Sequence, residues 1–192
     1  MTKEEIRKHY LDKRLGYSDG YIEEASVAIC RHFFKRFELT NVRCIHLFLS
    51  IAEKKELNTQ PILDSLLTTF PTLPIALSKS NFQTNELYLY QYDPMIPMLK
   101  NRYGIPEPQG GSKISPQSLD IALVPLLITD LHGHRIGYGK GFYDRFLAEC
   151  RPGCLKIGLS LEEPIDKLPA EPFDFPLTHC ISPTRIYDFF PK

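Results

Sequence analysis

The sequence has 192 residues, enough for one domain that buries its own core without disulfides or metal ions, and we expect residues 1–192 to form a single domain. Basic and acidic side chains number 23 each, so the formal net charge is zero and no overall field draws the chain to nucleic acid or membrane. No apolar run approaches the ~20 residues that span a bilayer. The five cysteines form no CxxC pair, which favours reduced thiols in a cytoplasmic protein.

The first predicted element is a helix that carries a basic stripe. Thr2 can cap this helix, and Glu5 follows three residues later, which is the spacing of a capping box. At 100° per residue, Lys3, Arg7 and Arg14 fall within about 40° of one another around the helix axis. The stripe has two interpretations at this point, a solvated basic face or one wall of an anion pocket.

A second helix is predicted after Ser18, where apolar residues recur at helical intervals from Tyr21 to Phe37. The next segments are a strand within Arg43–Ser50, a short helix over Pro61–Phe70, and strands at Ile75–Leu77 and Glu86–Tyr90. In Arg43–Ser50, His46 is predicted to be a satisfied core residue and not a base.

The second half of the chain opens with Gly104–Ser118, whose glycine, proline and serine content predicts a surface connection. Leu119–Ile128 is predicted to be one strand buried on both faces. A glycine loop follows, and then a helix, with Leu155–Leu159 as a last strand before a tail of proline-punctuated coil. The apolar face of that helix is predicted to consist of Phe142, Phe146, Leu147 and Cys150.

Helices that alternate with apolar strands predict an α/β fold, a three-layer α/β/α sandwich with a largely parallel sheet. Ligands in such folds gather at the carboxyl ends of strands, where loops lead into helices. The glycine loop after Ile128 occupies a position of that kind.

The glycine loop, Asp130–Arg145, has the composition of a phosphate site. It holds four of the eleven glycines of the chain, and it leads into a helix whose N-terminal amides and dipole favour anions. Arg135, Lys140 and Arg145 add full positive charges. The segment matches neither the Walker A pattern nor the dinucleotide fingerprint. The alternative interpretation is a tight turn without a binding role. The glycines are Gly133, Gly137, Gly139 and Gly141.

Asp144 is an acidic residue within this basic segment. A carboxylate beside a polyphosphate is repulsive unless a cation lies between them. Mg²⁺ resolves the conflict because it binds one or two carboxylates together with phosphate oxygens. The alternative is an ordinary acidic residue at a helix N-terminus.

From these residues the chain resembles the 5-formyltetrahydrofolate cyclo-ligases, also called 5,10-methenyltetrahydrofolate synthetases. The stretch LVPLLITDLHGHRIGYGKGFYDRFL resembles the signature of that family. Weaker motifs stand in the same order along nearly the whole chain: KxxxR at Lys3 and Arg7, FLS at 48–50, ExxT from Glu56, GIPEP at 104–108 and FDFPL at 173–177. The family's layout is similar to that of sugar-phosphate isomerases and CoA transferases.

The resemblance implies an ATP-dependent ring closure. ATP phosphorylates the formyl oxygen of 5-formyltetrahydrofolate, N10 attacks the activated carbon, and phosphate leaves to give 5,10-methenyltetrahydrofolate. Such chemistry depends on positioning and on neutralising the transferred phosphoryl group. The implied partners are 5-formyltetrahydrofolate and ATP, with Mg²⁺ as cofactor, and we expect a monomer without a nucleic-acid or membrane partner.

The resemblance also implies roles for individual residues. Lys140, Arg135 and Tyr143 are the implied catalytic residues, with Lys140 as the cation that stabilises the phosphoryl group. Asp144 and Asp174 are the implied Mg²⁺ ligands. ATP would contact Lys3, Arg7, Arg135, Ile136, Gly137, Tyr138, Gly139, Lys140, Gly141, Phe142 and Tyr143. The folate would contact Leu49, Glu56, Tyr138, Gly139, Lys140, Gly141 and Phe142, with Glu56 accepting hydrogen bonds from the pterin N–H groups.

The sequence departs from the family pattern at two places. Between Ser50 and Glu56 the chain is about two residues longer than in some members, so Glu53 or Lys54 is an alternative to Glu56. Tyr138 stands where some members have arginine, which removes one cation and leaves a ring that can stack. Two other functions remain as alternatives: a non-catalytic nucleotide- or phospholigand-binding module, and a nucleic-acid-binding protein, which zero net charge disfavours.

Overall fold

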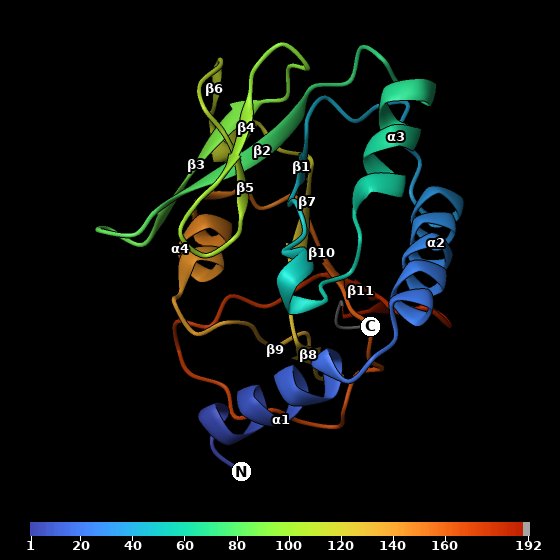
Figure 1. Cartoon of the computed structure of the whole chain (residues 1–192), viewed down its shortest axis with the longest axis vertical. Helices are drawn as coiled ribbons and strands as arrows, with labels where there is room; N and C mark the ends of the chain where they lie inside the picture. Colours follow the sequence, from blue (N-terminus) through green and yellow to red (C-terminus); the bar gives the residue numbers. More distant parts are fainter. Residues whose placement is uncertain (190–192) are drawn as a thin grey trace.

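An eight-stranded mixed sheet forms the centre of the computed structural model, which describes residues 1–189 (Figure 1). Five neighbouring strands are parallel to one another, and antiparallel strands flank them at both edges. The prediction of a largely parallel α/β sheet is therefore confirmed. From one edge to the other the strands are β12 (Ile186–Asp188), β11 (His179–Ile181), β10 (Leu155–Leu159), β7 (Ile121–Pro125), β1 (Ile45–Leu47), β2 (Ile75–Asn81), β3 (Glu86–Gln91) and β6 (Lys113–Ile114).

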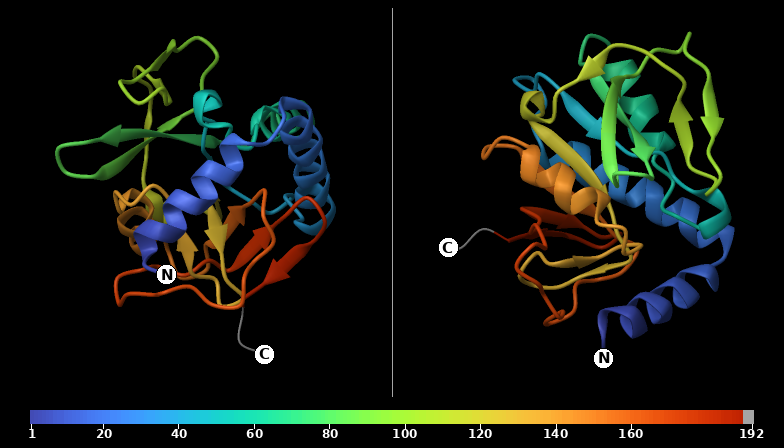
Figure 2. Two further views of the ribbon diagram at one scale, coloured as in Figure 1. Left: turned by 60° about the horizontal axis from the view of Figure 1, so that its bottom comes forward. Right: turned by 90° about the vertical axis from the view of Figure 1, so that its left-hand side faces the viewer.

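Helices cover both faces of this sheet, as the three-layer prediction requires. Helices α2 (Asp19–Arg36) and α3 (Gln60–Thr69) pack on one face, and α4 (Phe142–Glu149) packs on the other. Helix α1 (Lys3–Leu15) lies apart from both layers, beside the small hairpin of β8 (Ile128–Thr129) and β9 (Arg135–Ile136) (Figure 2). The remaining elements are the hairpin β4 (Met98–Lys100) and β5 (Pro106–Pro108), and the 3₁₀ turns η1 (Ala52–Lys54) and η2 (Pro116–Ser118).

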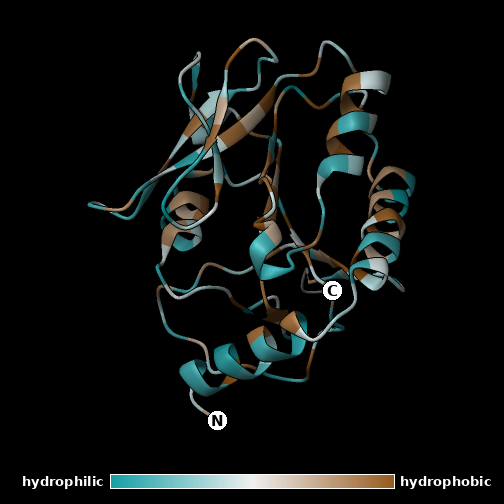
Figure 3. Cartoon of the chain, viewed as in Figure 1, coloured by the Kyte–Doolittle hydropathy of each residue, from teal (hydrophilic) through white to brown (hydrophobic). Residues whose placement is uncertain are grey.

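The sheet separates two apolar clusters, and a third, smaller cluster beside α1 contains Ile6, Ile128, Ile136 and Leu168. In β1, Ile45 and Leu47 face α2 and α3, while His46 lies on the opposite face against Phe146 of α4. This alternation follows from the two-residue period of a strand. Apolar colour is concentrated along the central strands, whereas α1 is largely hydrophilic (Figure 3). Helix α1 buries only Ile6 and Arg14, so apolar burial contributes little to its position.

The local signals at the helix ends behave as the sequence predicts. Thr2 accepts a hydrogen bond from Glu5 N, and Glu5 Oε2 accepts one from Thr2 N, which completes the capping box of α1. Ser18 caps α2 by accepting from Tyr21 N. These caps fix where both helices begin, because they satisfy amides that lack partners within the helix.

Three predictions about the second half of the chain are wrong. Leu119–Ile128 is not one strand: β7 ends at Pro125, and Ile128 starts the separate β8–β9 hairpin. The tail is not coil throughout, because β11 and β12 lie in it and extend the sheet. Gly104–Ser118 is more than a surface connection, since it contains β5, β6 and the buried Glu107, whose carboxylate accepts from Ser80 N. Cys150 is buried, as predicted, but it lies just after the last residue of α4. As the C-cap, its backbone N–H donates to the Leu147 carbonyl.

Within residues 1–189, no helix is long and apolar enough to cross a membrane. All five cysteines are free and buried.

Candidate active site

The glycine loop connects the β8–β9 hairpin to α4 and is shaped by two glycines with positive φ. Gly139 has a φ of 81°, and Gly141, the N-cap of α4, has a φ of 70°. Both values lie in the region that L side chains rarely adopt, so this backbone path depends on glycine. Gly133 is also left-handed, but it forms the turn of the β8–β9 hairpin and does not belong to the loop at the helix. Within the predicted glycine loop, the stretch that leads directly into α4 is therefore Gly137–Gly141.

The tip of this loop carries an exposed lysine. Lys140 is exposed, and its ammonium makes no hydrogen bond, ion pair or ring contact with any residue that the structure describes. Arg145 lies beside it and donates from Nη1 to the Lys140 carbonyl at 3.4 Å. Two positive charges thus stand at the N-terminus of α4, where the helix dipole also favours an anion.

The basic stripe of α1 faces the glycine loop and the late tail. Arg7 donates from Nε to the Gly137 carbonyl at 2.9 Å, and its guanidinium lies against Gly139, where an added Cβ would come within 2.8 Å of it. Lys3 pairs with Asp174 at 2.6 Å and with Glu171 at 2.8 Å. Arg14 donates to the Tyr138 hydroxyl. The stripe is therefore not merely solvated, because each of its three basic side chains contacts the glycine loop or the tail.

Both predicted metal ligands lie near Arg135, on one side of the loop. Arg135 pairs with Asp144 Oδ1 at 2.8 Å and donates to the Phe175 carbonyl. Burial lowers the pKa of this guanidinium, against the opposing pull of Asp144 and, more weakly, Asp174. Asp144 Oδ1 also accepts from Phe175 N at 3.1 Å. The second oxygens, Asp144 Oδ2 and Asp174 Oδ1, make no hydrogen bond in the described part of the chain.

The residues predicted for the folate meet the loop at Tyr138. Glu56 is 6% exposed, and its Oε2 accepts from Ile51 N at 2.7 Å, while its Oε1 accepts from the Tyr138 hydroxyl at 2.6 Å. Burial raises the pKa of Glu56. Leu49 is half-buried and packs on the α2–α3 side of the core, just after β1. The carboxyl end of β1 therefore does lead into the candidate site.

The structure separates Glu56 from its two sequence alternatives. Glu53 is exposed and pairs with Lys100 at the surface. Lys54 lies with its ammonium 4.3 Å from the centroid of the Tyr138 ring, so it contributes charge but no acceptor. Among the three, only Glu56 is buried and points at the glycine loop.

The first turn of α4 is enclosed by aromatic rings. Burial raises the pKa of Tyr143, and its ring lies edge-on to His46 at 6.0 Å between centroids. Phe142 meets Phe82, from the β2–β3 turn, edge-on at 5.4 Å. The rings around Phe142 and Tyr143 thus form an apolar, aromatic surface, which can exclude water from a bound ligand.

Comparison with known proteins agrees with this geometry. A sequence model of the 5-formyltetrahydrofolate cyclo-ligase family matches residues 1–183. The chain belongs to this family. Its relatives include the 5-formyltetrahydrofolate cyclo-ligase of Escherichia coli K12, 30% identical over 70% of this chain and 75% of that protein. The Haemophilus influenzae cyclo-ligase is 27% identical over 92% of this chain and 95% of that protein.

Solved structures agree with the cyclo-ligase assignment. The NMR structure of the Aquifex aeolicus 5,10-methenyltetrahydrofolate synthetase covers 100% of this chain and 95% of that one, with a TM-score of 0.82 and 25% identity. A 5,10-methenyltetrahydrofolate synthetase from Mycoplasma pneumoniae shares the fold at a TM-score of 0.75 and 20% identity, over 95% of this chain and 99% of that one.

Sequence reasoning did not single out several residues that lie beside the candidate site. Phe82 and Tyr103 lie 4.6 Å apart in two different hairpin turns, with the Arg102 guanidinium near both rings. No periodic pattern marks turn residues, so nothing in the sequence singled them out. Arg14 was noted in the stripe, but its contact with Tyr138 could not be derived from helix geometry alone.

Proposed function

We propose that this chain catalyses the ATP-dependent cyclisation of 5-formyltetrahydrofolate to 5,10-methenyltetrahydrofolate, with release of ADP and phosphate. One observation carries the proposal within the site: Tyr138 belongs to the glycine loop, yet its hydroxyl is bound to Glu56, the acceptor expected for the pterin. One hydrogen bond thus joins the proposed phosphate loop to the proposed pterin acceptor. Family membership over residues 1–183 supports the same reaction.

The proposed chemistry needs a cation at the transferred phosphoryl group, and Lys140 meets that need. The formyl oxygen attacks the γ-phosphorus of ATP, and ADP leaves. N10 then attacks the formyl carbon, the oxygen departs as phosphate, and N10 gives up its proton. Lys140 has no partner among residues 1–189 that it would have to release, so it can neutralise the phosphoryl oxygens directly. The loop amides and the α4 N-terminus hold the remaining phosphates.

The other loop residues position the two substrates in this proposal. Arg7 and Lys3 contact the phosphates from α1, and Arg135 holds Asp144 beside them. Tyr143 packs against the rings of His46 and Phe146, next to the reacting groups. The pterin lies between Glu56 and Leu49, and Gly139 and Gly141 allow both substrates to approach the backbone closely.

Asp144 and Asp174 fit a Mg²⁺ ion that is shared with phosphate oxygens. Each carboxylate has one oxygen held by a cation of the site and a second oxygen without a hydrogen bond among residues 1–189. Two carboxylates suffice because Mg²⁺ takes its other ligands from phosphate and water. When bound, the ion would neutralise the phosphates and orient them. No cluster of three or more His, Cys, Asp or Glu suited to a metal occurs in the described residues.

The decisive experiment mixes the protein with Mg-ATP and 5-formyltetrahydrofolate and follows the absorbance of the methenyl product. We expect turnover that requires both substrates, and ADP in equal amount. Folded protein that binds ATP but forms no product would indicate the non-catalytic nucleotide-binding module instead. A monomeric state and a cytoplasmic location stay predictions.

A further inference from the structure

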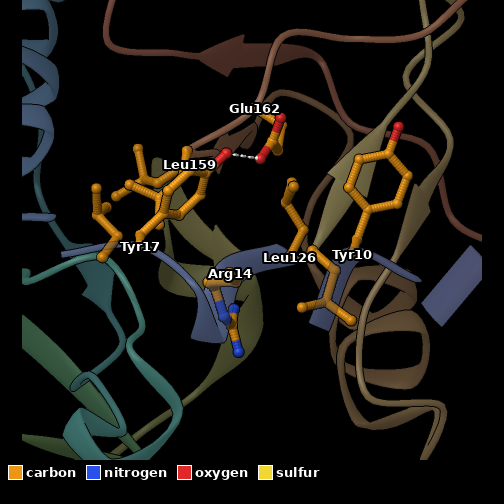
Figure 4. Close-up of a pocket in the computed structure, with 9 residues that line it drawn as sticks. Tyr10, Arg14, Tyr17, Leu126, Leu159 and Glu162 are labelled. Carbon is orange, nitrogen blue, oxygen red and sulfur yellow. Dashed lines mark hydrogen bonds between the residues drawn. The ribbon is translucent and has the colours of Figure 1, made fainter. Parts of the chain in front are cut away.

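Arg14 is a buried cation without a carboxylate partner. Its side chain comes from the last turn of α1, the residue is 6% exposed, and its Nε has no hydrogen-bond partner in the described chain. Glu162 lines the same small pocket as Arg14, but its carboxylate is occupied by Lys13 at 2.6 Å and by the Tyr17 hydroxyl. In Figure 4 the guanidinium of Arg14 points away from Glu162 and Tyr17. Burying an unpaired charge is unfavourable, so this placement calls for an explanation.

The guanidinium leads instead to Glu56 through a phenol. Arg14 Nη2 donates to the Tyr138 hydroxyl, and the same hydroxyl donates to Glu56 Oε1 at 2.6 Å. The guanidinium also lies 5.4 Å from the centroid of the Tyr138 ring. A cation and a carboxylate are thus joined by one neutral group, which orients both and keeps them apart. Hydrogen bonds in such a chain polarise one another.

We propose that Arg14 is a positioning residue for folate recognition: through Tyr138 it holds Glu56 as an ionised, oriented acceptor for the N–H groups of the pterin. The inference rests on the folate-binding part of the proposed cyclo-ligase function. It assigns to Arg14 a role distinct from that of Lys3 and Arg7, which lie on the same stripe but contact the tail and the loop backbone. The stripe therefore serves both substrates, ATP through its first two turns and folate through its last.

The groups that face Glu56 support this division. They are Arg14 from α1, Lys54 from η1, Tyr138 from the loop and Tyr143 from α4. Burial raises the pKa of Glu56, and the charge of Arg14 opposes that rise more strongly than Lys54 does. Only an ionised carboxylate offers both oxygens as acceptors, and a protonated one presents a donor to a ring edge that is itself rich in donors.

Two substitutions separate the charge of Arg14 from its hydrogen bond. Arg14→Gln keeps an N–H donor for Tyr138 and removes the charge, whereas Arg14→Lys keeps the charge and loses the planar fork. A nearby opposite charge moves a carboxyl pKa by roughly 1–3 units. We therefore expect Arg14→Gln to raise the KM for 5-formyltetrahydrofolate about tenfold or more at the acidic end of the pH profile, with recovery as the pH rises and Glu56 ionises. The KM of Arg14→Lys for 5-formyltetrahydrofolate should stay within about threefold of wild type, because lysine keeps the charge that favours ionised Glu56. A shift of a full pKa unit would correspond to a factor of about ten.

The KM for ATP should change less than about threefold in both variants, which a general loosening of α1 would not produce. Lys13→Met is the matched control. It removes a charge from the same helical turn, but Lys13 pairs with Glu162 and does not contact Tyr138 or Glu56. Three results would each overturn the proposal. They are an equal rise of the folate KM in Arg14→Gln and Arg14→Lys, a parallel rise of the KM values for folate and ATP, and a folate KM of Arg14→Gln that does not change with pH. If Arg14→Gln does not fold, a tenfold loss of folate affinity in Arg14→Lys would overturn it equally.

Calorimetry without ATP gives a readout that does not depend on turnover. When 5-formyltetrahydrofolate is titrated at pH 6.5 in buffers of different ionisation enthalpy, Arg14→Gln should release up to one proton more than wild type, because binding ionises Glu56. Equal proton release would refute the role of Arg14. Wild-type protein that binds folate yet forms no methenyl product would instead refute the proposed function and leave this inference standing.

Discussion

His46 provides a test of the fold that does not depend on the proposed chemistry. The residue is fully buried, its Nδ1 hydrogen-bonds with the Leu123 carbonyl at 3.1 Å, and its Nε2 has no partner among the described residues. The predicted core position is confirmed, but the side chain is only half satisfied. Its neighbours on the α4 side are the rings of Tyr143 and Phe146. Burial in this apolar site lowers the pKa of His46 from 6.5 to about 4.

This shift makes the stability of the protein depend on pH in a defined window. Above pH 6.5 His46 is neutral in both the folded and the unfolded chain. As the pH falls from 6.5 towards 4, the unfolded chain takes up a proton that the folded chain excludes, so the free energy of unfolding falls. At about 1.36 kcal/mol per pKa unit, the loss between pH 7 and pH 5 is about 2 kcal/mol.

The assay is urea unfolding at pH 7, 6 and 5, followed by circular dichroism because the chain has no tryptophan. His46→Asn removes the titration and keeps a donor near the Nδ1 position. The difference in unfolding free energy between pH 7 and pH 5 should shrink by about 2 kcal/mol in this variant. Exposed His9→Asn is the control and should keep the wild-type difference. A change below about 0.5 kcal/mol for His46→Asn would show that the histidine is not held neutral in the core.

Three further predictions concern the glycine loop. Lys140→Met should lower kcat about 10²–10³-fold while calorimetric folate binding stays near wild type, and near-normal kcat would remove Lys140 from the phosphoryl group. Asp144→Asn should raise the Mg²⁺ concentration needed for half-maximal turnover, whereas an unchanged Mg²⁺ dependence would leave Asp144 only its pairing with Arg135. Gly139→Ala should raise the KM for ATP and lower the unfolding free energy by about 1 kcal/mol, because φ is 81° there and the new Cβ meets Arg7; a silent substitution would refute the close contact.

The parts of the fold that could be predicted are those specified by local physics. The capping box at Thr2 and the helical spacing after Ser18 depend only on nearby residues, so they were correct. Strands β11 and β12 were missed because each has three residues, too few for a two-residue period to stand out. They become strands by extending β10, which is a tertiary effect. Pro125 marked the end of β7, but the apolar residues around it concealed the break.

The candidate site was predictable as a set of residues but not as a set of contacts. The glycines and cations of the loop indicate phosphate by themselves, and the family resemblance added Glu56. The hydrogen bond between Tyr138 and Glu56 joins residues 82 positions apart, and no spacing argument reaches that far. The pairing of Asp144 with Arg135 was likewise hidden, because the sequence shows two opposite charges in one loop and not which of them meet.

The contacts that hold α1 against the site are also the contacts that the proposed substrates would replace. Lys3 and Arg7 are proposed to bind phosphate, yet here they bind Asp174, Glu171 and the Gly137 carbonyl. Pairs of this partly exposed kind contribute little net stability, at most about 1 kcal/mol each, so exchange for a highly charged phosphate chain is favourable. Helix α1 buries little apolar surface, so its docking depends on these polar contacts. Nucleotide binding should therefore tighten α1 on the loop, and hydrogen exchange of the α1 amides should slow when Mg-ATP is added; exchange that is unchanged at saturating nucleotide would contradict this coupling.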